Sequence, residues 1–415
     1  MSQLHTAPKV NRQTLYVIIA LVLGVIAGEL LNLSVAEPVL TTITEGLTVV
    51  TDTFMRLVKM IIAPLVFATL VVGMGKMGDG QTVGRVGGKA LLWFMSASLL
   101  SLLLGMLLVN VLAPGESLHI ALPAADAKTG ISITQPSLAN FVAHIVPKSI
   151  FEALAANEIL QIVVFSAFFG IACAHLGGLA EPMLKTLDSL GHIMLKVTTY
   201  VMHFAPFAVF AAITAVIARQ GLAVLGSYAV FIGEFYLGLL LLWLVLGGIG
   251  VVFLGVHRVV SLLRHIREPA LLAFGTASSE AAYPKLLQQL ERFGCPEKIA
   301  GFVLPLGYSF NLDGSMMYMT FAVLFIAQAY GIDMPLAQQL LMLLVLLFTS
   351  KGVAGVPRAS LVVIAATLSM FGIPEAGLLL LLGVDQLLDM GRSASNVFGN
   401  SLATAIVSRW ERALR

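Results

Sequence analysis

Long apolar runs with almost no charge constrain the fold of this chain more than any other feature of its sequence. Hydrophobic residues make up 58% of the 415 positions and charged residues only 11%, against about 25% charged in soluble proteins. A helix needs about 20 apolar residues to cross the hydrocarbon core of a bilayer. Such runs occur at residues 15–33, 54–74, 90–113, 159–176, 192–217 and 223–254. The sequence therefore predicts an all-α, multi-pass membrane protein with six spans in its first part.

The distribution of lysine and arginine predicts how these spans are oriented. Basic residues collect in the short loops on the cytoplasmic side of a membrane. Lys9 and Arg12 precede the first run, whereas the next loop, residues 35–50, contains Glu37 and Glu45 and no basic residue. We therefore expect a cytoplasmic N-terminus. A total of eight spans would put the C-terminus on the same side.

Two segments of the second part are predicted to be re-entrant hairpins. Residues 269–294 carry a patch of small and polar residues at 276–284, and residues 340–370 carry a similar patch at 349–357. Neither segment is long enough to cross a bilayer twice. Backbone that is not helical is tolerated at membrane depth only where protein or a wet cavity surrounds it. Both patches should therefore line one shared cavity, whereas Lys351 is expected to face solvent at the outer surface.

A helix interrupted at its centre is predicted between the two hairpins. The apolar run at 299–329 contains Asn, Asp, Gly and Ser within residues 311–315, and these residue types weaken a helix. A broken helix presents free amides to anions and free carbonyls to cations. This interruption is therefore a candidate site for a solute or a cation.

The last predicted helix, residues 374–407, carries charge where charge is costly. Four polar residues lie four, three and four positions apart, so they share one helical face. They are Asp385, Asp389, Arg392 and Asn396. Such a face should line a cavity or meet a partner. Together with the broken helix it predicts a transporter of a small charged solute, with an ion channel as the alternative.

Other classes of function lack the residues that they need. The basic residues lie in short clusters between apolar runs, so no nucleic-acid surface is expected. The sequence has no His-rich metal motif, no Gly-x-Ser-x-Gly element and no phosphate-binding loop, so we expect neither an enzyme nor a cofactor. Cys173 and Cys295 lack metal-ligand spacing. The expected partners are the lipid bilayer and a solute.

Four motifs resemble those of the dicarboxylate/amino acid:cation symporter family, which includes the glutamate transporters. They are the serine-rich hairpin ending at Pro284, the run 307–315, the tip 355–357 and the polar face 385–396. The resemblance covers nearly the whole chain. It implies eight transmembrane helices and two re-entrant hairpins, in a homotrimer of the bacterial inner membrane. It also implies an elevator mechanism, in which residues 256–415 form a transport core and residues 1–255 mainly a trimerisation scaffold, with some helices contributing to the mobile part.

The resemblance implies a substrate site for L-glutamate or L-aspartate. Arg392 would bind the side-chain carboxylate of the substrate, because a planar guanidinium suits a carboxylate, and Asp389 would bind its amino group. The other implied residues are Asn396, Ser315, Ser278, Ser279, Ser393 and the backbone of Gly355 and Val356. A C4-dicarboxylate has no amino group and would leave Asp389 unpaired. It is therefore the alternative substrate.

The coupling ion is expected to be a proton, with sodium as the alternative. Hard cations need several oxygen ligands and usually a carboxylate. Where sodium-coupled members of the family have an aspartate, a tyrosine and a threonine, this chain has Asn400, Phe94 and Ala97. The remaining candidates for a cation site are Gly307, Ser309, Asn311, Asp313, Asn400, Ser98 and Ser350. The candidate proton carriers are Glu280, Asp313 and Asp389, and no metal ion other than sodium is expected.

Overall fold

Helices account for nearly all of the structure. The computed structural model describes residues 12–75, 80–116, 123, 146–352 and 359–415. Of these residues 89% are helical, and none lies in a strand. Seven helical segments in the same ranges are long and apolar enough to cross a membrane. This confirms the all-α prediction and is consistent with a protein that spans a membrane.

The first part of the chain forms mainly long apolar helices. In the described ranges they are α1 (Arg12–Ser34), α2 (Glu37–Gly75), α3 (Gly80–Leu112), α5 (Ile150–Ala156), α6 (Ile159–Leu176), α7 (Glu181–Val201), α8 (Ala205–Ser227) and α9 (Ala229–Leu254). Two 3-10 turns, Gly177–Leu179 and Met202–Phe204, flank α7. The run predicted as one span at 192–217 is therefore the junction of α7 and α8.

The prediction of a loop at residues 35–50 is wrong, because α2 begins at Glu37. Threonines in this stretch hydrogen-bond to carbonyls of the preceding turn, as Thr48 does to Thr44 at 2.8 Å and Thr42 to Pro38 at 3.1 Å. These bonds satisfy the hydroxyl groups inside a helix. A polar stretch can thus be helical, and here it extends α2 to 39 residues.

The second part of the chain is divided into shorter helices. They are α10 (Val256–Thr276), α11 (Ser279–Phe293), α12 (Glu297–Phe310), α13 (Asp313–Ala329), α14 (Leu336–Thr349), α15 (Ala359–Met370), α16 (Leu378–Leu382) and α17 (Asp385–Trp410). The 3-10 turns Ser350–Gly352 and Glu375–Gly377 follow α14 and precede α16. The final helix predicted at 374–407 is therefore split, and Asp385 is the first residue of α17.

The two predicted hairpins and the predicted helix break correspond to these divisions. The arms α10 and α11 pack against each other across a turn at Ala277, whose φ of 48° is left-handed. The arms α14 and α15 also pack together, and the tip between them, with Gly355 and Val356, lies outside the described residues. Between α12 and α13, Asn311 and Leu312 have ψ values of 63° and 67°. The helix is therefore broken within the predicted stretch.

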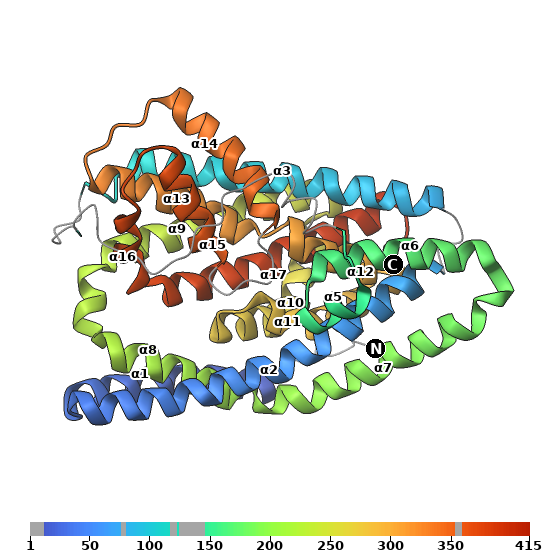
Figure 1. Ribbon diagram of the computed structural model, residues 1–415, viewed down its shortest axis with the longest axis horizontal. Coiled ribbons are helices and arrows are strands. Elements are labelled where there is room, and N and C mark those ends of the chain that lie inside the picture. The colour runs from blue at the N-terminus through green and yellow to red at the C-terminus, as the bar shows by residue number, and fades with distance from the viewer. Residues whose placement is uncertain (1–11, 76–79, 117–122, 124–145, 353–358) are drawn as a thin grey trace, which may run out of the picture.

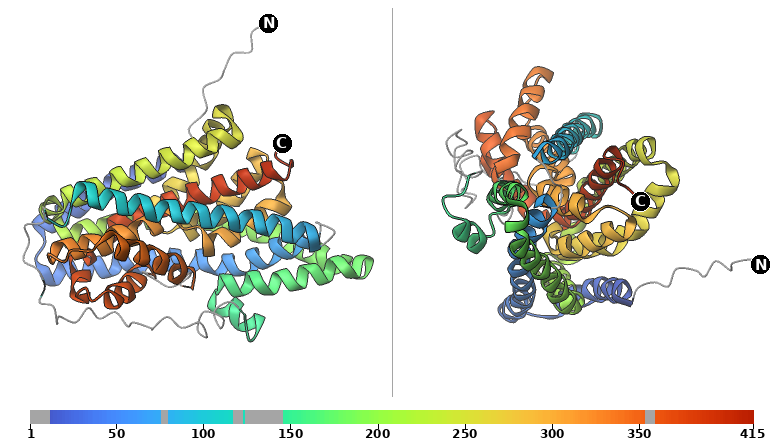
Figure 2. Two further views of the ribbon diagram at one scale, coloured as in Figure 1. Left: turned by 90° about the horizontal axis from the view of Figure 1, so that it is seen from above. Right: turned by 90° about the vertical axis from the view of Figure 1, so that its right-hand side faces the viewer.

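The broken helix and the polar helix lie at the centre of the molecule (Figure 1). Helices α1, α2, α7 and α8 run along one side of it (Figure 1 and Figure 2). Of these, α2 packs against α11 and α12 of the second part. Helix α3 packs against α12, α13 and α17, and α9 packs against α17. Almost every residue of α13 is buried, whereas α1 exposes large apolar side chains such as Leu23 and Ile26.

Close contact between α13 and α17 predicts a strong effect of Gly314→Ala. A Cβ at Gly314 would lie 2.6 Å from the carbonyl oxygen of Arg392 and 2.8 Å from Cβ of Ser395, so the two helices would have to separate. We expect a loss of about 1–3 kcal/mol of stability, measured by thermal unfolding of the purified protein. Gly88→Ala is the control, because Gly88 has open space around it. Equal stability of the two variants would contradict this close contact.

Candidate functional site

Arg392 is the centre of a buried cluster of charges. Its side chain is 2% exposed, and its Nη2 lies 3.1 Å from Oδ1 of Asp385 and 3.0 Å from Oδ1 of Asp389. The guanidinium carbon lies over the ring of Tyr318, 3.9 Å from the centroid. The hydroxyl of Tyr318 in turn donates to Oδ1 of Asp385 at 3.0 Å. Two carboxylates and an aromatic face together stabilise a guanidinium that could not otherwise be buried.

Part of the guanidinium is left without a hydrogen bond. Nε and Nη1 of Arg392 are buried and have no partner among the described residues. A guanidinium carries five N–H donors in one planar fork, which can bind a carboxylate through two parallel bonds. Beside it, the side chain of Asp389 is 32% exposed, against 4% for Asp385. The site therefore offers unused donors next to an accessible negative charge.

Asn396 connects the polar face of α17 to the beginning of α13. Its Oδ1 accepts hydrogen bonds from the backbone N–H groups of Gly314 at 2.9 Å and Ser315 at 3.3 Å, and its Nδ2 donates to Oγ of Ser315 at 3.1 Å. The first N–H groups of a helix lack partners in the helix itself, and Asn396 supplies them. Ser393, on the same helix, is buried. The structure thus places Arg392, Asp389, Ser393 and Asn396 on one helix and joins Asn396 to Ser315 of α13.

The two serines of the first hairpin have local partners. Oγ of Ser278 accepts a hydrogen bond from the N–H of Ala281 at 3.3 Å and so caps α11. The carbonyl of Ser279 accepts from the hydroxyl of Tyr308 at 2.9 Å. Ser278 therefore uses its hydroxyl to begin a helix, and no described hydrogen bond joins either serine to Arg392.

The predicted cation residues surround the break between α12 and α13. Asp313 is fully buried, with Oδ2 accepting from Nδ2 of Asn311 at 3.0 Å and Oδ1 lying 3.4 Å from Oγ of Ser101. The same amide of Asn311 lies 3.4 Å from Oδ1 of Asn400. A Cβ at Gly307 would collide with the side chain of Asn400. These residues form one buried polar network.

The expectation that Lys351 faces solvent is wrong. Its side chain is 5% exposed, and Nζ donates to the carbonyl of Phe310 at 2.6 Å and to Oγ of Ser98 at 2.8 Å. Ser98, a predicted cation residue, therefore holds an ammonium group. Ser350 turns its hydroxyl back to the preceding helix, 3.3 Å from the carbonyl of Leu347.

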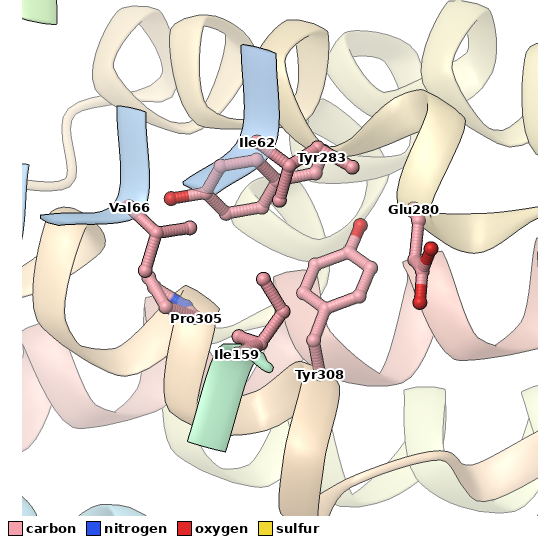
Figure 3. A pocket seen from close by; sticks show the side chains of 7 residues that line it. All are labelled: Ile62, Val66, Ile159, Glu280, Tyr283, Pro305 and Tyr308. Atoms are coloured by element: carbon pink, nitrogen blue, oxygen red, sulfur yellow. The ribbon is translucent and has the colours of Figure 1, made fainter. Parts of the chain in front are cut away.

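A small pocket adjoins Glu280, one of the candidate proton carriers (Figure 3). It leaves about 10 Å³, enough for a single water molecule. The rings of Tyr283 and Tyr308 meet there edge to face, with centroids 5.3 Å apart. The lining residues are Ile62, Val66, Ile159, Glu280, Tyr283, Pro305 and Tyr308. Glu280 therefore lies beside a mainly apolar pocket.

Comparison with known proteins assigns the chain to a family. A sequence model of the sodium:dicarboxylate symporter family matches residues 14–410. The chain belongs to this family. A proton/sodium-glutamate symport protein of Geobacillus stearothermophilus is 40% identical over 401 residues, which cover 95% of this chain and 93% of that protein. A C4-dicarboxylate transport protein of Laribacter hongkongensis is 43% identical over 369 residues, 88% of this chain and 83% of that protein.

Sequence reasoning missed several members of this symporter's polar interior. Asp385 was recognised as polar but was not assigned to the site, and Tyr318 gave no signal because it lies in an apolar run. Ser101 could have been found, since it lies three positions after Ser98 and shares its helical face. Lys351 could not have been placed, because its partners lie 41 and 253 positions away in the sequence.

Proposed function

We propose that this protein is a secondary active symporter that takes up L-glutamate or L-aspartate together with protons. The observation that carries the proposal is the buried guanidinium of Arg392, whose Nε and Nη1 have no partner among the described residues. The family and the names of the relatives support symport of acidic solutes. Nη1 of Arg392, whose N–H groups have no partner among the described residues, would donate to the side-chain carboxylate of the substrate.

The neighbouring acid favours an amino acid over a dicarboxylate. Asp389 is close to Arg392 and partly exposed, so it can pair with a substrate ammonium. Succinate and similar C4-dicarboxylates have no such group and would place a carboxylate near Asp389 without compensation. A C4-dicarboxylate is the second candidate, because relatives with that name reach 43% identity.

The main carboxylate of the substrate would lie near the start of α13. We place it between Ser315 and Asn396 on one side and the first hairpin, with Ser278 and Ser279, on the other. Ser393 and the backbone of the second hairpin tip complete the proposed site. The N-terminal end of a helix favours an anion nearby because the helix dipole is positive there.

We propose that the substrate crosses the membrane on a mobile core within a trimer. Residues 256–415 would move against a scaffold formed mainly by residues 1–255, in a bacterial inner membrane with both termini cytoplasmic. Family membership supports this arrangement. The packing of α3 and α9 on the central helices α13 and α17 supports their moving with the core.

Replacing Asp389 tests the choice of substrate. Asp389→Asn removes the charge assigned to the substrate ammonium at nearly constant volume. Loss of a desolvated ion pair costs about 2 kcal/mol or more, which corresponds to about a thirtyfold loss of affinity. We expect glutamate uptake by proteoliposomes to fall accordingly and succinate to become a stronger competitor. Asp333→Asn, at an exposed acid, is the control. Unchanged glutamate affinity in Asp389→Asn would contradict the assignment.

Glu280 is the proton carrier that we propose. Asp313 and Asp389 are engaged with Asn311 and Arg392, whereas Glu280 has no hydrogen bond or ion pair among the described residues and adjoins an apolar pocket. Glu280→Gln should still exchange labelled for unlabelled glutamate but should no longer accumulate glutamate when a proton gradient is imposed. Accumulation at the wild-type level would exclude Glu280 as the carrier.

A further inference from the structure

Lys351 directs its ammonium group into the protein at the break between α12 and α13. The lysine belongs to the 3-10 turn that follows α14, and its two hydrogen-bond partners belong to α12 and α3. A lysine at the edge of a membrane protein normally extends its long side chain toward water. Here the side chain is 5% exposed. The position of Nζ therefore requires a specific attraction from the surrounding groups.

The broken helix provides the first part of that attraction. In a continuous helix the carbonyl of Phe310 would accept a hydrogen bond from the N–H of Gly314, but this N–H donates to Asn396 at 2.9 Å. The carbonyl of Phe310 thus lies at the negative end of α12 without its usual helical donor. Nζ of Lys351 binds it at 2.6 Å.

Helices α3 and α13 complete the surroundings with oxygen atoms. Ser98 and Ser101 lie on one face of α3; Oγ of Ser98 accepts from Nζ at 2.8 Å, and Oγ of Ser101 lies 3.4 Å from Asp313. Asp313 is fully buried and is the acidic member of this network, through its contacts with Asn311 and Ser101. A backbone carbonyl, hydroxyl groups and a carboxylate are the ligand types that hard metal cations prefer. The ammonium therefore occupies surroundings suited to a small cation.

We infer that Lys351 is a built-in cation, which fills a cation position at the helix break and excludes free sodium from it. This goes beyond the proposed function and does not depend on which substrate is carried. A tethered group has a high effective concentration at its own site, so dissolved sodium competes poorly with it. When the ammonium is removed, the carbonyl of Phe310 and the hydroxyl of Ser98 lose their positive donor, and the buried network around Asp313 loses a nearby positive charge, which is costly. A sodium ion can then take its place.

A purely structural role for Lys351 predicts a different result. If the ammonium only ties the hairpin arm to α3, an uncharged side chain weakens the protein equally in every salt. If it replaces a cation, the same variant gains a response that is specific for sodium. The two roles are therefore separated by the ion dependence of stability, independently of transport activity.

The test is the thermal stability of full-length Lys351→Met in sodium chloride and in choline chloride at equal ionic strength. We expect sodium to raise Tm by about 2 °C or more and to saturate, as binding to the folded state requires. Wild type should show no comparable rise. Lys285→Met is the matched control, because Lys285 is a partly buried lysine paired with Glu268 at 3.1 Å. Adding Asp313→Asn to Lys351→Met should abolish the response.

Several outcomes would overturn the inference. One is a folded Lys351→Met protein with no greater response to sodium than wild type, and another is an equal rise in Lys285→Met. Lys351→Gln serves as a second uncharged variant. Recovery of either Lys351 variant only when sodium is present would support the inference. Failure of both variants to fold in both salts would contradict it, since sodium should then have replaced the missing charge.

Discussion

The break between α12 and α13 is the constraint on which the polar interior of this symporter depends. Ending one helix at Phe310 and starting the next at Asp313 frees carbonyls on one side and N–H groups on the other. Both helices are almost entirely buried, so other parts of the chain must satisfy these groups. Asn396 binds the N–H groups and Lys351 binds the carbonyl of Phe310. The break thus holds α3, α17 and the second hairpin together.

Charge balance is the reason for proposing that the neighbouring cluster binds an amino acid. Two carboxylates, from Asp385 and Asp389, surround the single guanidinium of Arg392, so the cluster has one negative charge in excess. An ammonium group on the substrate compensates that excess at Asp389, while Arg392 remains able to bind a carboxylate. Asp385 and the ring of Tyr318 keep the guanidinium in position. A solute that carried carboxylates alone would leave this excess uncompensated.

The sequence predicted the features that follow from composition and helical periodicity. The run at 159–176 coincides with α6, and the weak helix formers at 311–315 mark the observed break. The spacing from Asp385 to Asn396 correctly places those residues on one helix. The sequence does not reveal the division between α16 and α17. Only one glycine and one valine separate the apolar stretch of α16 from the more polar stretch of α17, so the two look continuous.

Contacts between distant segments could not be predicted in the same way. A charged residue beside a hairpin tip normally faces water, and this reasoning placed Lys351 at the surface. Its burial depends on a carbonyl that only the helix break makes available and on the hydroxyl of Ser98 in another element. The contact between the ring face of Tyr318 and Arg392 likewise depends on how α13 packs against α17.

The most direct test of the account is uptake of radiolabelled glutamate by proteoliposomes that contain the purified protein. Two conditions are compared, an inward proton gradient with sodium balanced and an inward sodium gradient with protons balanced. We expect concentrative uptake with the proton gradient alone and none with the sodium gradient alone. Uptake that requires sodium, or no uptake under either gradient, would contradict it.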